Sequence, residues 1–267
     1  MKNTKKFVTP MLLVLIGLAT LSFIAKDEIT LRLHPQQGKS YTVVSKATSM
    51  NMMEVQGQTI NMSQTMETNQ SFTVKEATDT QSVIEAQIES MKMSVSQMGM
   101  KFEYDSDHPE KTSPMIAEQT KELAKSIKKP SMLTYDAMGN MISEKEEESM
   151  NSLANAIIKM PEDPISVGST WKTSNTQSVS DMEMTVEFTY TVTAISKKSI
   201  DVSFKGNILE NKDNITGNYS GTASINPTTG LIMKSNTKST VAMTISQQGL
   251  TIPTTISGNA TVTVTEK

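Results

Sequence analysis

Apolar and polar residues alternate one by one along most of this chain. Between Met182 and Ala194, every even-numbered residue is apolar and every odd-numbered residue is Thr or Glu. Successive side chains of a β-strand point to opposite faces, so the pattern predicts a strand with one wet face and one face that must be covered. Similar segments follow one another with turn residues between them in each half of the chain. This organisation favours antiparallel sheet connected by hairpins.

Two central segments break the alternation with helical spacing. We expect a helix at 108–129, with Asp107 as its N-cap, and a second helix at 144–160. The predicted fold is therefore α+β and β-dominated, with one or two curved antiparallel sheets of half-barrel or open-barrel shape covered by the two helices. The first β unit is 26–143, which contains the first helix, and the second β unit is 161–267.

Two finer features accompany this architecture. Apolar positions are even-numbered from Ile84 to Ile88 and odd-numbered from Met91 to Val95, and this one-residue slip predicts a β-bulge. Each β unit opens on glycine followed three residues later by an aromatic, Tyr41 in one and Trp171 in the other. This similarity indicates a weak internal duplication.

The first 25 residues are expected to be a secretory signal peptide. Lysines at 2, 5 and 6 precede the apolar run Met11–Ile24, and the chain is polar from Lys26 onward. The alternative is an uncleaved anchor, because the apolar segment is nearly long enough to span a bilayer. We therefore expect the periplasm, the cell envelope or the extracellular space, with membrane contact only through this segment if it is uncleaved.

Composition excludes several classes of protein. The chain has no cysteine, which rules out disulfides, a thiol nucleophile and a lipid-modified cysteine. A net charge of −3 gives no basic surface for nucleic acid. The oligomeric state is not specified by the sequence.

Several motifs resemble an uncharacterised family of secreted Bacteroidota proteins. They are Gly38-x-x-Tyr41, Tyr104-Asp105-Ser106-Asp107, Pro161-x-x-Pro164 followed by Gly168-x-x-Trp171, Gly217-x-x-x-Gly221-Thr222 and Thr229-Gly230-Leu231. The resemblance implies a β-rich fold and an exported location, and it implies no activity. This chain departs from many exported proteins of those bacteria because it lacks a lipobox cysteine.

Methionine is abundant, with 21 residues against six Phe, five Tyr and one Trp. Because the methionines follow the strand periodicity, they are best explained as adaptable side chains on an apolar face. Such a face could also accept an acyl chain, and thioethers could bind Cu(I). The candidate lining of a hydrophobic groove is Ile60, Met62, Met66, Phe72, Met91, Met93, Met98, Met100 and Phe102.

Catalytic signals are weak. The only histidines are His34 and His108, and no nucleophile, phosphate-loop or zinc motif is present. The segment Asp105–His108 offers two carboxylates and an imidazole for a cation, but it is better explained as a helix cap. We therefore predict no catalytic residues, metal or cofactor.

The leading hypothesis is an exported, non-enzymatic protein that binds a hydrophobic ligand such as an acyl chain. The alternative is a structural or protein-interaction module of the cell envelope with a fully packed core. A hydrolase on a β scaffold or a Cu(I)-binding protein comes third.

Overall fold

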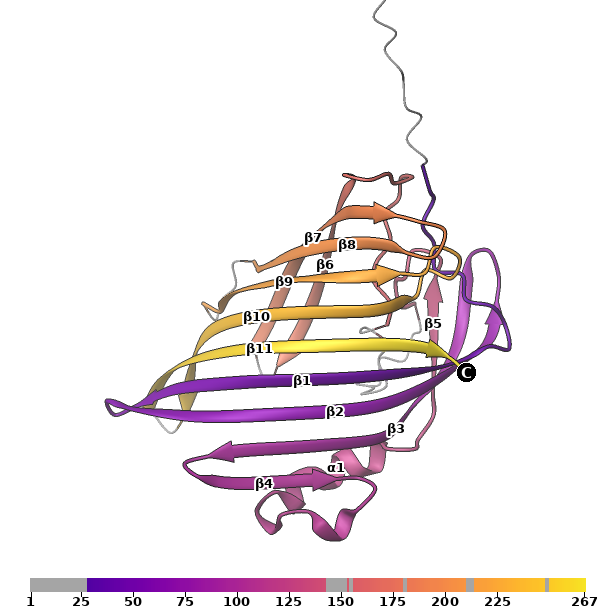
Figure 1. Cartoon of the computed structure of the whole chain (residues 1–267). Helices are drawn as coiled ribbons and strands as arrows, with labels where there is room; N and C mark the ends of the chain where they lie inside the picture. Colours follow the sequence, from indigo (N-terminus) through magenta and orange to yellow (C-terminus); the bar gives the residue numbers. More distant parts are fainter. Residues whose placement is uncertain (1–27, 143–152, 154–155, 180–181, 210–213, 248–249) are drawn as a thin grey trace, which may run out of the picture.

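The computed structural model describes residues 28–142, 153, 156–179, 182–209, 214–247 and 250–267 (Figure 1). The predicted signal peptide, 1–25, lies outside the described residues. The first strands are β1 (Ser40–Val55), β2 (Gln58–Ala77), β3 (Gln81–Gln97), β4 (Met100–Asp105) and β5 (Ser131–Asp136). The later strands are β6 (Thr170–Val179), β7 (Met182–Ile195), β8 (Ile200–Ile208), β9 (Thr216–Ile225), β10 (Ile232–Gln247) and β11 (Leu250–Glu266). Between β4 and β5 lie two 3-10 turns, η1 (Pro109–Lys111) and η2 (Pro114–Ile116), and the helix α1 (Ala117–Ser126).

All described strands belong to one antiparallel sheet. Its order is β4-β3-β2-β1-β11-β10-β9-β8-β7-β6, and β5 pairs with the beginning of β3. β1 and β11 join the two halves of the chain, in register from Tyr41 opposite Glu266 to Met53 opposite Thr254. The sheet curls but does not close into a barrel, since β4 and β6 end its order (Figure 1). The β-dominated antiparallel prediction is confirmed, as a single open sheet. The unit boundaries and the duplication stay predictions.

The two ends of the strands differ in their connections. The β1–β2 and β3–β4 turns lie at one end, on the left in Figure 1, which we call the tip end, and β6, β8 and β10 also finish at this end. Both turns have two residues, Gln56-Gly57 and Met98-Gly99, with positive φ at each residue. Such turns match the twist of paired strands. The opposite end, where β1 begins and β11 finishes, we call the core end.

The main hydrophobic core fills one face of the sheet at the core end. Its strand residues include Tyr41, Phe72, Ile84, Val192 and Ile225. We call this face of the sheet the inner face. The core is closed by the plug, defined as residues 29–33 and 156–165, whose buried core members are Leu31, Leu33, Ala156, Ile157, Met160 and Ile165.

The plug is tied to several parts of the sheet. Ile29 and Ile165 exchange backbone hydrogen bonds of 2.9 Å within it. Met160 N donates to Met138 O near β5 at 2.8 Å, and Ile232 N of β10 donates to Ala156 O at 3.0 Å. These bonds satisfy the backbone of an irregular segment that lies against an apolar core.

Gly221 on the inner face of β9 allows the ring of Phe204 to approach the backbone. A Cβ atom at Gly221 would lie 2.1 Å from the carbonyl oxygen of Asn236 and 2.4 Å from the ring of Phe204. Only glycine fits there without movement of the strand. The Gly217-x-x-x-Gly221 motif therefore has a packing role at Gly221.

The predicted bulge in β3 is confirmed. The register between β2 and β3 shifts at Asn69 and Gln70, which pair with Ser90 and Ile88 and leave Glu89 as the extra residue. As a result, Ile88 and Met91 pack in the same hydrophobic cluster despite their different parity.

The helical predictions need correction. The predicted helix 108–129 is α-helical only over Ala117–Ser126, and Asp107 does not cap it. Proline disfavours helical backbone at the residue before it, and Ser113, before Pro114, is extended with ψ 128°. The predicted helix 144–160 is wrong for residues 157–160, which are irregular. There, Met160 bonds to Met138 instead of an intrahelical carbonyl. Residues 144–152 and 154–155 lie outside the described residues. Among the described residues, a cover of two central helices is therefore not supported.

Tyrosine burial predicts sensitivity to high pH. Burial raises the pKa of Tyr190 from 10 to about 12, and it also raises the pKa of the other four tyrosines, Tyr41, Tyr104, Tyr135 and Tyr219. A raised tyrosine pKa means that folding favours the neutral form. The contribution of Tyr190 to the free energy of unfolding is thus complete below pH 10 and is lost as pH rises towards about 12.

We expect Tyr190 alone to account for about 2–3 kcal/mol of stability lost over this interval. Tyrosinate absorbance and circular dichroism, followed together against pH, should show ionisation accompanying unfolding, and Tyr190→Phe should reduce the loss. Ionisation of all five tyrosines near pH 10 in a protein that stays folded would contradict this assignment.

Candidate apolar binding face

The candidate lining residues lie mostly on one face of the sheet. The register from Tyr41–Phe72 to Val55–Gln58 is unbroken, so the even-numbered apolar residues of β2 share the inner face with Phe72. Opposite them on β3, Met93 pairs with Met66, and on β4 Phe102 pairs with Val95. The structure thus brings together Ile60, Met62, Met66, Phe72, Met91, Met93, Met100 and Phe102 on the inner face.

Three of the nine predicted lining residues are not part of an accessible apolar surface on the inner face. Phe72 is 1% exposed and stacks on Tyr41 with ring centroids 4.8 Å apart, so it belongs to the core. Met91 is buried in a cluster that also includes Ile116, directly before α1, and Leu123, within α1. Met98 is 74% exposed because it lies in the β3–β4 turn. Their assignment as groove lining has no support from this arrangement.

The remaining six residues form what we call the open patch. These are Ile60, Met62, Met66, Met93, Met100 and Phe102, towards the tip end of β2, β3 and β4. Met66 is 36% exposed and Met100 is 51% exposed, while the other four are half-buried. The inner face therefore stays apolar beyond the core, where its side chains remain accessible. Their role as ligand lining stays a prediction.

The inner face continues across β1, β11 and β10. Small residues occupy its middle, including Ala47 and Ser49 of β1, Gly258 of β11 and Ser239 of β10, which the register places side by side. Larger apolar residues return towards the tip end: Met53, Ile252, Ile256, Met243 and Ile245. Sequence reasoning missed these residues as possible lining. Their alternation was visible, but their position beside the open patch depends on the pairing of β1 with β11.

Three polar atoms of β1 on this face are buried without a hydrogen-bond partner among the described residues. Tyr41 Oη lies in the core, and Ser45 Oγ and Asn51 Oδ1 lie further towards the tip end. A buried polar atom left without a partner costs about 1–3 kcal/mol. The inner face thus combines apolar side chains with polar atoms that could accept or donate a hydrogen bond.

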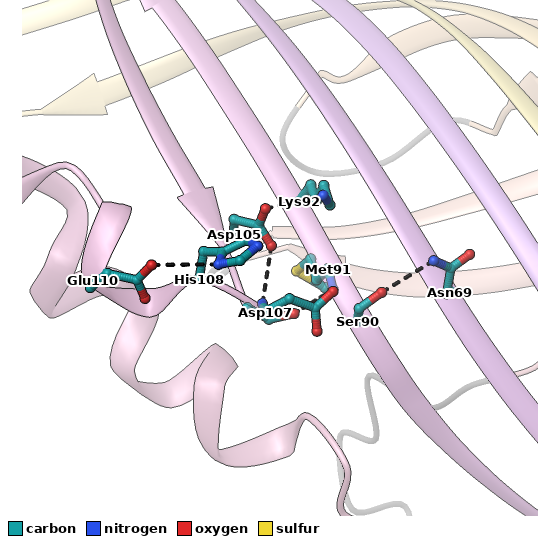
Figure 2. Close-up of polar contacts among 9 residues, drawn as sticks. Asn69, Ser90, Met91, Lys92, Asp105, Asp107, His108 and Glu110 are labelled. Carbon is teal, nitrogen blue, oxygen red and sulfur yellow. Dashed lines mark hydrogen bonds and ion pairs between the residues drawn. The ribbon is translucent and has the colours of Figure 1, made fainter.

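The Asp105–His108 segment is engaged in local contacts, shown in Figure 2. Lys92 Nζ lies 3.1 Å from Asp105 Oδ2, and the backbone N–H of Asp107 donates to Asp105 Oδ1 at 3.0 Å. Burial opposes ionisation of Asp105, but these bonds outweigh it and lower its pKa. His108 Nδ1 lies 3.4 Å from Glu110 Oε1. Within the described ranges, no group of three or more potential metal-ligating His, Asp or Glu residues occurs.

The neighbouring Ser106 fixes the same segment to the sheet. Its hydroxyl accepts a hydrogen bond from Met91 N at 2.9 Å, and its own N–H donates to Met91 O at 3.0 Å. The segment therefore anchors the connection after β4 onto β3.

The fold defines a class of open, curled antiparallel sheets with one plugged end and one accessible apolar face. Within this framework, residues 118–232 match the model of a family of unknown function, DUF6263. That range runs from α1 to the first residue of β10. The match agrees with the resemblance to an uncharacterised family, while the Bacteroidota origin and the motifs stay predictions. A comparison with curated protein sequences gives no match.

Similar solved structures are distant. A structure of lipid–protein interactions in lipovitellin shares 12% identity with a TM-score of 0.45, covering 86% of this chain and 25% of lipovitellin. This chain thus spans about a quarter of that protein. An outer membrane channel from Pseudomonas putida F1 shares 7% identity with a TM-score of 0.28, covering 86% of this chain and 97% of the channel. The translocator domain of the autotransporter NalP from Neisseria meningitidis shares 6% identity with a TM-score of 0.22, covering 85% and 89%. These TM-scores are too low to carry an argument about function.

Among the described residues, no helix has the length and apolar character needed to cross a membrane.

Proposed function

We propose that this protein is an exported, non-enzymatic binding protein for a hydrophobic ligand such as an acyl chain. The observation that carries the proposal is the open patch. Six apolar side chains share the inner face, continue the surface of the packed core and remain accessible to solvent. Covering apolar surface gains about 25 cal/mol per Å², so an apolar ligand is the natural occupant of such a face.

The residue types of the patch suit a flexible ligand. Met62, Met66, Met93 and Met100 are unbranched thioethers that can repack around chains of different shape. The unpartnered Ser45 Oγ and Asn51 Oδ1 on the same face favour an amphiphile over a pure hydrocarbon, since a polar group could satisfy them.

Export is part of the proposal because the N-terminal sequence has the order of a secretory signal. A basic segment precedes the apolar run Met11–Ile24, and polar sequence follows it. The periplasm, cell envelope or extracellular space is the corresponding location.

The alternative is a structural or protein-interaction module of the cell envelope. In that case the open patch would be covered by another protein rather than by a lipid. Within the described residues, no specific observation favours a hydrolase or a Cu(I)-binding protein.

Native mass spectrometry of the purified, full-length protein distinguishes the two. We expect a population carrying an added mass of one lipid or fatty acid, which organic extraction removes and identifies. A single protein mass with nothing extractable, after purification without detergent, would count against a lipid-binding role.

A further inference from the structure

A cavity whose lining includes no residue of the open patch lies at the core end, beside the edge strand β6. Its volume is about 420 Å³. It is formed by the plug, the turn after β5 and the first residues of β6. The lining includes Arg32, Asn140, Lys159, Glu162, Trp171 and Thr173, and we call this cavity the edge pocket.

Hydrogen bonds to backbone carbonyls hold its cationic side chains. Arg32 donates from Nη1 to Leu31 O and Pro161 O and from Nη2 to Glu162 O, each at 2.8 Å, which leaves its Nε–H and one Nη2–H. Lys159 Nζ donates to the carbonyl oxygen of Ser174 on β6 at 2.9 Å. The hydrogen bonds of Arg32 stay within the plug, and that of Lys159 joins the plug to β6. Both side chains are therefore held on the walls of the pocket.

The charges of these two side chains are not balanced by ion pairs. A carbonyl oxygen accepts a hydrogen bond but carries no net negative charge. Neither Arg32 nor Lys159 takes part in an ion pair among the described residues, whereas Lys172, which also lines the pocket, is 2.9 Å from Glu187. Among the described lining residues, Glu162 is the one carboxylate. The described lining therefore carries a surplus of positive charge.

The indole ring of Trp171 gives the edge pocket an apolar surface beside its cations. Trp171 stacks on Tyr190 with ring centroids 4.9 Å apart, and its Nε1–H donates to Lys159 O at 3.0 Å. Tyr190 covers one face of the indole, so the part of Trp171 that lines the pocket is its edge or opposite face. Met138 and Met160 add apolar surface.

We propose that the edge pocket binds a small organic anion, with a carboxylate or phosphate held by Arg32 and Lys159 and a ring or short apolar group against Trp171. Cations suit the anionic group, and arginine in particular can bind carboxylate or phosphate oxygens through two N–H groups. The apolar part of the ligand gains from contact with the indole and the methionines. This site is independent of the hydrophobic-ligand proposal, since it shares no residue with the open patch.

Trp171 is the sole tryptophan of the chain, so its fluorescence reports directly on this pocket. We expect benzoate and phenyl phosphate to change tryptophan emission saturably. Benzamide, which has the same ring without the charge, should bind at least about tenfold more weakly. Added salt should weaken benzoate binding and leave benzamide unaffected.

The decisive variant is Lys159→Gln, with Lys46→Gln as the control. Lys46 of β1 is outside the pocket lining and forms an ion pair with Glu67 of β2. Lys159→Gln should weaken benzoate binding at least about fivefold, and Lys46→Gln should leave it unchanged. If Lys159→Gln does not fold, the salt dependence and the benzamide comparison of the wild-type protein decide the matter.

Two further probes separate a free anion from a lipid headgroup. A tryptophan response to phosphatidylglycerol vesicles, absent with phosphatidylcholine vesicles, would assign the anion to a lipid headgroup, whereas a response to phenyl phosphate alone would assign it to a free molecule. The proposal is overturned by equal responses to benzoate and benzamide, by a tryptophan response of equal size to both kinds of vesicle, or by no saturable response to any anion. Loss of binding to the same extent in both lysine variants would also overturn it.

Discussion

Phe72→Ala is expected to destabilise the protein by about 3–5 kcal/mol, because it removes a fully buried ring from the core end. Phe72 is 1% exposed, lies on the inner face of β2 and stacks on Tyr41. The plug limits how far the surrounding residues can move to refill the space. A cavity therefore remains, and its cost adds to the lost transfer free energy of the ring.

The matched control is Phe102→Ala, which removes the same side chain from the same face of the sheet. Phe102 is half-buried in the open patch, so we expect a loss of only about 1 kcal/mol. Urea unfolding of both variants and the wild type measures the difference. Equal losses at the two positions would mean that the tip end is packed as tightly as the core end.

Local alternation was enough to predict strands, faces and the bulge in β3. The change of parity between Ile88 and Met91 marked an extra residue, and the register shift at Glu89 confirms it. These features depend on residues close in sequence, which is why periodicity reveals them.

The helix predictions failed where local and tertiary effects compete. The helical spacing from Ile116 to Ile127 suggests a helix that also includes the residues before Pro114. Ser113, the residue before that proline, has extended backbone instead. At the other end, Ile127 leaves the helix and forms a bridge with Ile88 of β3. Residues near 160 join the plug, where Met160 binds Met138 and packs into the core. Such pairings between distant segments cannot be seen in the spacing of apolar residues.

The candidate site was partly predictable for the same reason. Alternation placed all nine predicted lining residues on one apolar face, and the structure places eight of them on the inner face, with Met98 in the β3–β4 turn. It could not show that Tyr41 covers Phe72 or that Ile116 and Leu123 pack with Met91. It also could not show that β11 would lie beside β1, or that the plug would hold Arg32 and Lys159 near Trp171.

Met66→Glu is expected to weaken binding of an uncharged fluorescent acyl probe by at least about tenfold, or about 1.4 kcal/mol. Met66 belongs to the open patch and lies where it borders β1, with Ala47 on one side and Met93 on the other. A carboxylate there would have to lose water beneath an apolar ligand, which is costly without a partner. At 36% exposure, Met66 is accessible enough for the unliganded protein to tolerate the charge.

Met50→Glu provides the matched control. Met50 is on β1, which pairs with β2, but it has the opposite parity to the inner-face residues and is 56% exposed. The two variants carry the same change in net charge on opposite faces of the same hairpin. Their thermal midpoints should stay close to that of the wild type, which excludes unfolding as the cause of a binding defect.

The most direct test of the account is the ratio of acyl-probe dissociation constants for these two variants, measured by fluorescence titration. If the inner face binds the ligand, Met66→Glu raises the dissociation constant at least about tenfold, while Met50→Glu leaves it at the wild-type value. Equal constants for the two variants, or a wild-type protein that does not bind the probe saturably, would contradict the account.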